Sequence, residues 1–343
     1  MEPITCLLTS GALARASQKR LPRFGAAMLI TSGVAADLDY VSYFSGPVAF
    51  LRFHRTVLHS LIGSVVMCCA IAGAFCVADR FGGEKGSQSS TKNLRFHWAL
   101  LACVAGASVH IILDLASGIG VRLLWPFRGG WQSWDLLPNP DVWILLFLVV
   151  GLTIPHLAGL VSEEIGERKR GSPGRFAAMV ALAVVALYIG ARAGLHSRVI
   201  NLLVSRDYHG QPPQKSGAFP SGTNPFMWRG LVSTPGAIDE LNVSSLPGST
   251  FDPERALTHY KPEDTPAIAA AENTSYGKLF LTYARFPLAT VEPEGTGVDV
   301  TLRDLRFPAD DRSIEDVMLD VELDENSQLI RQRMRYAGLP RRR

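Results

Sequence analysis

Six ionisable side chains lie within or next to apolar segments of the first half of the chain, and their types indicate metal chemistry. They are Asp37, Asp39, His54, His59, His110 and Asp114. Imidazole nitrogens and carboxylate oxygens in this mixture suit Zn²⁺ or Mn²⁺. Any one of these histidines alone is better explained as a hydrogen-bonded core residue. Six such groups together favour a metal site that takes its ligands from three separate segments.

The spacing of these residues predicts how they are presented. His110 and Asp114 are four residues apart and share one helix face. Both can therefore meet one ion, or Asp114 can orient His110 from behind. Asp37 and Asp39 cannot share a face of a regular helix, so we expect them at a frayed helix end or in a loop, where one carboxylate can bridge two ions. The segment from His54 to His59 is expected to cross a loop-to-helix junction.

The elements that must position these residues are long uncharged runs. A helix that crosses the bilayer core needs about 20 apolar residues. The runs are Val57–Ala78, Phe96–Leu113, Val142–Val161, Phe176–Ala191 and Phe24–Ala36 with its apolar extension to Phe44, plus a weaker run at Ile4–Ala14. We therefore expect residues 1–195 to form an all-α polytopic membrane domain of about five transmembrane helices and a short N-terminal helix. A soluble helical bundle is disfavoured, because so many uncharged runs are hard to cover in water.

Charge separates the chain into two parts. Of its 343 residues, 47% are apolar and 19% are charged. Residues 1–197 carry 17 Lys and Arg against 11 Asp and Glu, whereas residues 198–343 carry 17 against 20. All five cysteines lie in the first part, which excludes a disulfide-stabilised tail. The net charge of +3 is too small to indicate a nucleic-acid partner.

The loop charges also predict an orientation. If residues 24–44 cross the membrane, the connections on one side carry twelve Lys and Arg and those on the other carry four. The basic side is then cytoplasmic by the positive-inside rule. The six ionisable residues and the tail after Leu195 are expected on the outer side. No signal peptide is evident at the N-terminus, so insertion is expected to rely on the helices themselves.

Residues 196–343 are expected to form a small β-rich soluble domain. A short amphipathic helix is predicted over residues 196–207, followed by a Pro-, Gly- and Ser-rich stretch over 211–225. Short runs with β character then predict one small antiparallel sheet. These runs are residues 225–234, 275–285, 297–307, 317–324 and 328–336. The tail contains no catalytic motif, which favours a docking or covering domain.

Other polar residues of the first part have simpler explanations. We expect Cys68, Cys69, Cys76 and Cys103 to be packing residues, and His97 and His156 to be structural. The Trp-rich segment 120–135 is either an interfacial aromatic belt or a loop that caps the metal site, with Arg122 or Asp135 touching substrate. The sequence contains no HExxH, GxSxG or P-loop motif, which disfavours zincin, serine-hydrolase and nucleotide-binding chemistry.

Taken together, several motifs resemble those of one known family. They are Pro3-Ile4-Thr5, Ala36-Asp37-Leu38-Asp39, the run from His54 to Ser60, His110 to Asp114, and the segments Gly120 to Phe127 and Trp131 to Asp135. This pattern resembles the inner-membrane-bound metal-dependent hydrolases of the YdjM-like, LexA-regulated group. It is similar to the longer subtype, which carries an extra soluble C-terminal region. The motifs cover about residues 3–141.

The chain departs from this family at three positions. Cys6 follows Pro3-Ile4-Thr5 where the family has histidine, Ala36 replaces a proline, and Asn139 replaces a glutamate. Two interpretations of Cys6 stay open. A thiolate binds Zn²⁺ well and would shift the preference away from Mn²⁺. Alternatively, a ligand has been lost and the activity is altered.

The resemblance implies a membrane-bound, metal-dependent hydrolase. The expected metal ligands are Cys6, Asp37, Asp39, His54, His59, His110 and Asp114. Asp37 or Asp114 is the expected general base, and Arg55 is expected to stabilise an anionic transition state. A site at the outer interface of the inner membrane suggests membrane lipids as partners and a lipid or other amphiphilic ester or phosphoester as substrate. The alternative is a non-enzymatic membrane protein with a structural or transport metal site.

Overall fold

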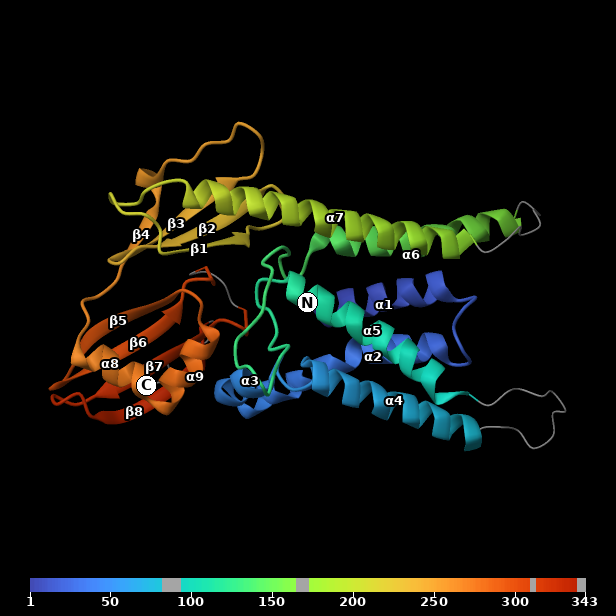
Figure 1. Ribbon diagram of the computed structural model, residues 1–343, viewed down its shortest axis with the longest axis horizontal. Coiled ribbons are helices and arrows are strands. Elements are labelled where there is room, and N and C mark those ends of the chain that lie inside the picture. Colours follow the sequence, from blue (N-terminus) through green and yellow to red (C-terminus); the bar gives the residue numbers. More distant parts are fainter. Residues whose placement is uncertain (82–93, 165–172, 309–312, 338–343) are drawn as a thin grey trace. The chain divides into compact units, whose positions relative to one another are not determined.

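The computed structural model describes residues 1–81, 94–164, 173–308 and 313–337 (Figure 1). The chain divides into two compact units, which are described separately. Unit 1 comprises residues 1–39, 55–127 and 132–193, and unit 2 comprises residues 40–54, 128–131 and 194–343. Two loops that lie between helices of the first half of the chain therefore belong to unit 2.

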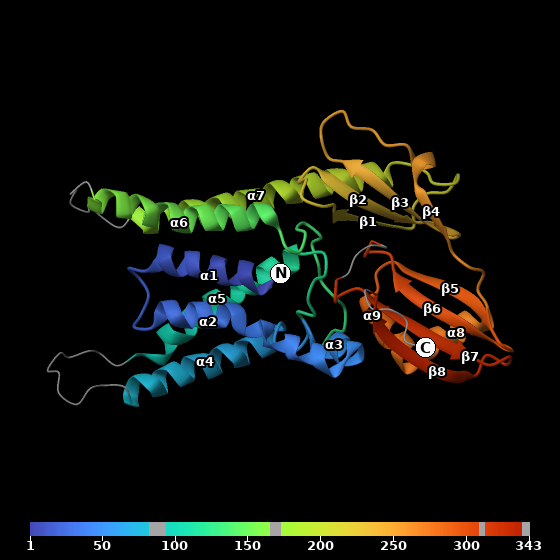
Figure 2. The same cartoon turned by 180° about the vertical axis from the view of Figure 1, so that it is seen from behind.

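Unit 1 is helical, as the apolar runs predict. Its helices are α1 Pro3–Ser17, α2 Gly25–Ala35, α4 Leu61–Phe81, α5 Phe96–Ala116, α6 Val142–Glu164 and the first part of α7 Pro173–Val204. Helix α2 packs along α5, α4 also packs on α5, and α1 lies beside α2 and α6 (Figures 1 and 2). Helix α5 carries His110 and Asp114 and contacts three of the other helices.

Three helices are long and apolar enough to cross a membrane: Leu61–Phe81, Phe96–Ala116 and Gly174–Val204. The expected number of about five transmembrane helices is not confirmed. Within the searched residues, the apolar part of α6 is the shorter run Val142–Pro155. Helix α2 has only 11 residues, because the chain tightens at Ala36 into the 3₁₀ helix η1, Ala36–Ser45. At 1.5 Å per residue, α2 is about 16 Å long, which is half of a bilayer core.

Helix α4 begins at Leu61, four residues after the predicted start at Val57. The residues before it form turns, and the Ser60 hydroxyl oxygen accepts a hydrogen bond from the Gly63 amide at 3.0 Å. This is the N-cap interaction that ends a loop and starts a helix. His59 therefore lies in the turn before α4 and is not part of the helix.

Two glycines allow the helices of unit 1 to approach closely. A Cβ at Gly106 of α5 would lie 2.1 Å from the Leu29 carbonyl oxygen of α2. A Cβ at Gly33 of α2 would lie 2.0 Å from the Ser10 hydroxyl oxygen of α1. Small residues at these crossings bring the backbones together, as in other membrane helix pairs. The Gly33 carbonyl consequently lies next to α5.

Unit 2 contains two four-stranded antiparallel sheets, where one small sheet was expected. The first has the order β1-β2-β3-β4 and the second β5-β6-β7-β8. The strands are Lys215–Pro220, Met227–Ser233, Ala237–Ser244 and Leu257–Tyr260, then Pro287–Glu294, Gly297–Asp304, Val317–Leu323 and Leu329–Tyr336. In β7, buried residues alternate with half-buried ones, so one face of the second sheet forms a core.

Three predictions for the tail are wrong. Residues 275–285 were expected to form a strand, but Ser275–Tyr283 is the helix α9, because the Thr274 side chain accepts a hydrogen bond from the Gly277 amide and caps it. The separate helix over residues 196–207 is instead the end of α7, which continues to Val204. Part of the Pro-, Gly- and Ser-rich stretch over residues 211–225 forms strand β1, because its residues pair along β2.

The loop over residues 40–54 is folded into unit 2. It contains most of η1 and the short helix α3, Pro47–Phe53, which contacts α9 and β8. The Tyr43 ring lies 4.9 Å from the Tyr336 ring of β8, and the Phe50 ring lies 6.0 Å from it. An aromatic core thus joins this loop to the second sheet.

Helix crossing in unit 1 can be tested at Gly106. Replacing Gly106 by Ala should lower the stability of the membrane domain by about 1–3 kcal/mol, because the added methyl group forces α2 and α5 apart. Gly73→Ala in α4 is the matched control, since a Cβ there meets nothing within 4 Å. That variant should be neutral or stabilised by up to about 1 kcal/mol. Thermal unfolding in detergent measures both, and equal melting temperatures for the two variants would contradict the packing argument.

Candidate metal centre

Six of the seven expected ligands come from four places in unit 1. Cys6 lies on α1, Asp37 and Asp39 on the first turn of η1, His59 in the turn before α4, and His110 and Asp114 on α5. Two groups of donor atoms converge in the described part of the chain: Cys6 with Asp37 and His110, and His59 with His110 and Asp114. His110 belongs to both groups and therefore lies at the centre of the site.

The second group is the more tightly arranged. The Nε2 atoms of His59 and His110 are 3.0 Å apart. Asp114 Oδ2 lies 3.1 Å from the first of these nitrogens and 3.2 Å from the second. All three residues have no solvent exposure. Donor atoms about 2.0–2.2 Å from a tetrahedral Zn²⁺ lie roughly 3.3 Å from one another, so this triangle has the size that one ion requires.

Each of the two imidazole rings also has a contact at its outer nitrogen, Nδ1, on the side away from the triangle. His110 Nδ1 lies 2.9 Å from the Gly33 carbonyl oxygen, which can only accept. His59 Nδ1 lies 3.0 Å from Asp39 Oδ2. In a neutral His110 ring the proton is therefore on Nδ1, and Nε2 presents its lone pair. A carboxylate or a carbonyl behind the ring is the usual support of a metal-binding histidine.

This arrangement requires a positive charge at its centre. Two imidazole nitrogens and a carboxylate oxygen lie about 3 Å apart, and burial weakens the screening of their partial negative charges. A shared proton or a metal ion removes the repulsion. Nitrogen and oxygen donors of this kind fit Zn²⁺. The residues therefore fit a divalent metal, in agreement with the prediction of possible metal ligands.

Asp114 is also held from its other side. The Arg55 guanidinium Nη1 lies 3.2 Å from Asp114 Oδ1, and the amino group of Met1 contacts the same oxygen. Arg55 Nη1 also donates to Ser117 Oγ at 3.3 Å and lies 3.5 Å from the Gly120 carbonyl oxygen. The buried guanidinium therefore orients Asp114, and one carboxylate connects the cationic groups to the two histidines.

Arg55 has an unusual backbone that links two parts of the site. Its φ angle is +54°, which L-residues rarely adopt. Its amide donates to Asp39 Oδ2 at 2.8 Å, and its carbonyl accepts from the Arg122 amide at 3.0 Å. Asp39 therefore contacts both the Arg55 amide and the His59 ring.

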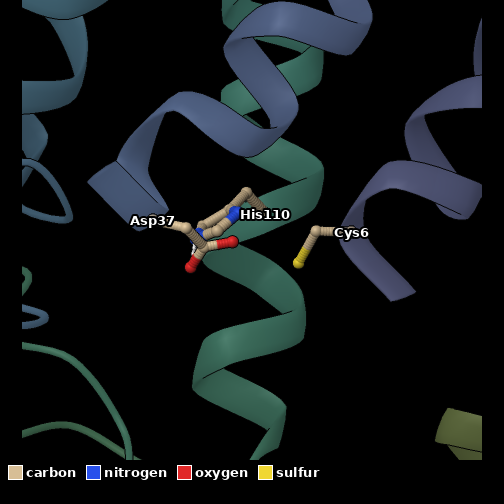
Figure 3. A group of neighbouring side chains, drawn as sticks. All are labelled: Cys6, Asp37 and His110. Carbon is tan, nitrogen blue, oxygen red and sulfur yellow. Dashed lines mark ion pairs between the residues drawn. The ribbon is translucent and has the colours of Figure 1, made fainter. Parts of the chain in front are cut away.

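Cys6 and Asp37 form the other set of donor atoms near His110. Figure 3 shows the Cys6 thiol and the Asp37 carboxylate directed toward the His110 ring, from separate helices. Their donor atoms lie within 4.8 Å of one another, and Asp37 Oδ1 is 3.7 Å from His110 Nε2. Asp37 Oδ2 is buried, with no hydrogen-bond partner among the residues that the structure describes. Because Nδ1 of His110 faces Gly33, both groups share one nitrogen, and one nitrogen binds one ion.

His54 lies elsewhere. Its ring is stacked on Phe50 with 4.4 Å between centroids and 19° between planes, and Tyr40 lies 4.4 Å away on another side. It belongs to unit 2, and neither donor group of the described chain includes it. The sequence could not separate His54 from His59, because both are histidines at one loop-to-helix junction.

The structure also locates polar residues that the sequence analysis considered outside the expected ligand set. Cys68 and Cys103 are buried in an apolar cluster between helices, whereas His97 is exposed at the start of α5. The buried Asp135 carboxylate accepts a hydrogen bond from the Ser133 hydroxyl at 2.6 Å and is in neither donor group. The side chain of His156 lies outside the described residues. Sequence reasoning missed the Gly33 carbonyl, because a backbone acceptor leaves no sequence signal beyond a glycine in an apolar helix.

Comparisons with known proteins agree with this architecture for the first part of the chain. No curated protein and no solved structure matches the sequence. The family model of the YdjM inner membrane protein matches residues 1–197, which include every residue of the candidate metal centre. The match covers more than half of the 343 residues, and the chain therefore belongs to the YdjM inner membrane protein family.

Proposed function

We propose that this protein is a membrane-bound hydrolase that uses one divalent metal ion held by His59, His110 and Asp114. The observation that supports it is the buried triangle of donor atoms from these three residues, with sides of 3.0, 3.1 and 3.2 Å. An ion bound there would act as a Lewis acid that polarises a scissile group and makes water more acidic.

The protein's own groups supply the remaining chemistry. Asp37 is the proposed general base, because its Oδ1 lies 3.7 Å from His110 Nε2 and its Oδ2 has no partner in the described chain. Asp39 keeps the proton on Nδ1 of His59, and Arg55 holds Asp114 in position. In this proposal Arg55 acts on Asp114, where the sequence suggested a contact with the transition state.

The proposed substrate is an amphiphilic ester or phosphoester, such as a membrane lipid. The donors lie at the ends of membrane-type helices, in a family of inner membrane proteins. The loop charges support the outer interface as the location of the site. A substrate at this depth must present a polar head and an apolar body.

A structural or transport metal site is the second candidate, and one observation favours it. His59, His110 and Asp114 have no solvent exposure, as expected for a closed site without an open coordination position. The unpartnered carboxylate oxygen of Asp37 favours catalysis instead. Metal content combined with hydrolysis therefore separates the two candidates.

The first test measures metal and activity together on the purified full chain in detergent. His59→Ala should lose bound metal and hydrolysis of bis(p-nitrophenyl) phosphate and ester lipids, because one of three close donors is removed. His97→Ala is the matched control and should keep both, since His97 is exposed and far along α5 from His110. Wild-type metal content in His59→Ala would contradict the site. If the native protein binds metal but hydrolyses neither substrate, the result would favour the structural or transport site over the hydrolase.

The second test concerns Cys6. If its thiolate is a ligand, Cys6→Ala should lower Zn²⁺ affinity by about 10-fold or more, and Cys6→His should keep it, because imidazole replaces the thiolate. The native thiol should resist alkylation until a chelator removes the metal. Cys103→Ala serves as the control for loss of a buried thiol. Equal metal affinity in Cys6→Ala and the native chain would show that Cys6 is not a ligand.

The third test concerns orientation. The bias of twelve Lys and Arg against four predicts that the tail after Leu195 lies outside the cytoplasm. A reporter that is active only in the cytoplasm should be silent when fused after Arg343, and one active only in the periplasm should work. The reverse pattern would place the tail and the site on the cytoplasmic side.

A further inference from the structure

The loop between the two site-bearing segments is held by the C-terminal part of the chain. Asp39 is the last residue of unit 1 before this loop, and Arg55 is the first residue after it. Residues 40–54 between them are part of unit 2, together with residues 194–343. Both ends of the loop are covalently joined to Asp39 and Arg55, so the conformation of the loop constrains the separation of these two residues.

The contacts that hold the loop are aromatic and lie within unit 2. We name the five rings of Tyr40, Tyr43, Phe50, His54 and Tyr336 the loop cluster. Within it the Tyr43–Phe50 distance is 6.3 Å and the Tyr43–Tyr336 distance is 4.9 Å, between ring centroids. Stacking of Phe50 on His54 extends the cluster to the last residue before Arg55. Tyr336 is the one member from the C-terminal sheet.

Tyr336 connects the second sheet to the loop 40–54. Its side chain is buried, and its hydroxyl lies 3.5 Å from the Tyr43 carbonyl oxygen. Burial, with a smaller effect from Tyr43, raises the pKa of Tyr336 to about 12. The hydroxyl contact is long, and the ring contacts with Tyr43 and Phe50 hold the loop. Ring contacts of this kind fix an otherwise irregular loop, because burying aromatic surface offsets the entropy of ordering it.

At the base of the loop, the ends meet at the metal centre. The Arg55 amide donates to Asp39 Oδ2 at 2.8 Å, and the same oxygen lies 3.0 Å from His59 Nδ1. A change in the loop would therefore move the carboxylate that fixes the His59 ring. Groups behind a metal-binding histidine change metal affinity by about 10–100-fold.

A second loop from the first half of the chain, residues 128–131, is also held by an aromatic contact within unit 2. Residues 128–131 interrupt unit 1 between Phe127 and Gln132, and they also belong to unit 2. The Trp131 ring lies 5.1 Å from the Tyr283 ring of α9 at an angle of 73°. The C-terminal part of the chain thus holds two loops of the first half, one of which joins the site residues directly.

We propose that the C-terminal part of the chain acts as a clamp on the loop 40–54, and that Tyr336 is a positioning residue for Asp39 and His59. The proposal rests on the metal centre proposed above. It assigns a role to the tail, which lies outside the segment matched by the family model. The clamp acts through the loop cluster and the covalent ends of the loop.

The test compares three variants of the full chain in detergent. Tyr336→Ala removes the ring, Tyr336→Phe keeps it, and Phe219→Ala removes a buried ring from β1 that packs on Phe286. Hydrogen exchange of peptides covering residues 40–59, including the Arg55 amide, reports on the loop and its base. Chelator competition reports on Zn²⁺ affinity.

Tyr336→Ala should speed exchange over residues 40–59 at least tenfold and weaken Zn²⁺ binding by about tenfold. Tyr336→Phe and Phe219→Ala should leave both near the native values. Unchanged exchange in Tyr336→Ala, or an equal effect of Phe219→Ala, would overturn the clamp. Faster exchange of the loop with native Zn²⁺ affinity would overturn the positioning role.

Failure of the metal centre itself gives a different result. If the native chain binds no Zn²⁺, the proposed function fails, and exchange of the Arg55 amide in Tyr336→Ala still decides whether the clamp aligns Asp39 with Arg55. A native exchange rate at Arg55 would then overturn the clamp, and a faster rate would support it.

Discussion

The site depends on one electrostatic constraint: two imidazole nitrogens and one carboxylate oxygen lie about 3 Å apart in a buried place. The nitrogens belong to His59 and His110 and the oxygen to Asp114. The Gly33 carbonyl accepts from Nδ1 of the His110 ring, and Asp39 Oδ2 lies 3.0 Å from Nδ1 of the His59 ring. Such a triangle is stable only around a positive charge, and the donor types fit a divalent metal.

Other features of unit 1 follow from this constraint. The Gly33 carbonyl reaches His110 because Gly33 and Gly106 let three helices approach at distances that a methyl group would prevent. Asp114 would be costly to bury alone, and the Arg55 guanidinium at 3.2 Å compensates its charge. The position of the Gly33 carbonyl beside His110 therefore depends on the helix packing.

The family model matches the first part of the chain and does not extend over the tail. The YdjM inner membrane protein family covers residues 1–197 and all of the candidate ligands. The tail forms two antiparallel sheets of its own and also incorporates the loop 40–54. A metal centre with one loop anchored in another unit can be influenced from that unit. This gives the tail a role although it contains no catalytic motif.

The sequence by itself determined the helical first part, the β-rich tail and the residue types of the site, because apolar runs and the His110–Asp114 spacing are local properties. It could not establish which donors meet. His54 and His59 are equivalent in sequence, yet one stacks on aromatic rings and the other joins the donor triangle. The number of membrane-length helices and the helix at Ser275–Tyr283 were also decided by structure. Long-range packing selects among local possibilities of similar energy, and only the tertiary structure contains that selection.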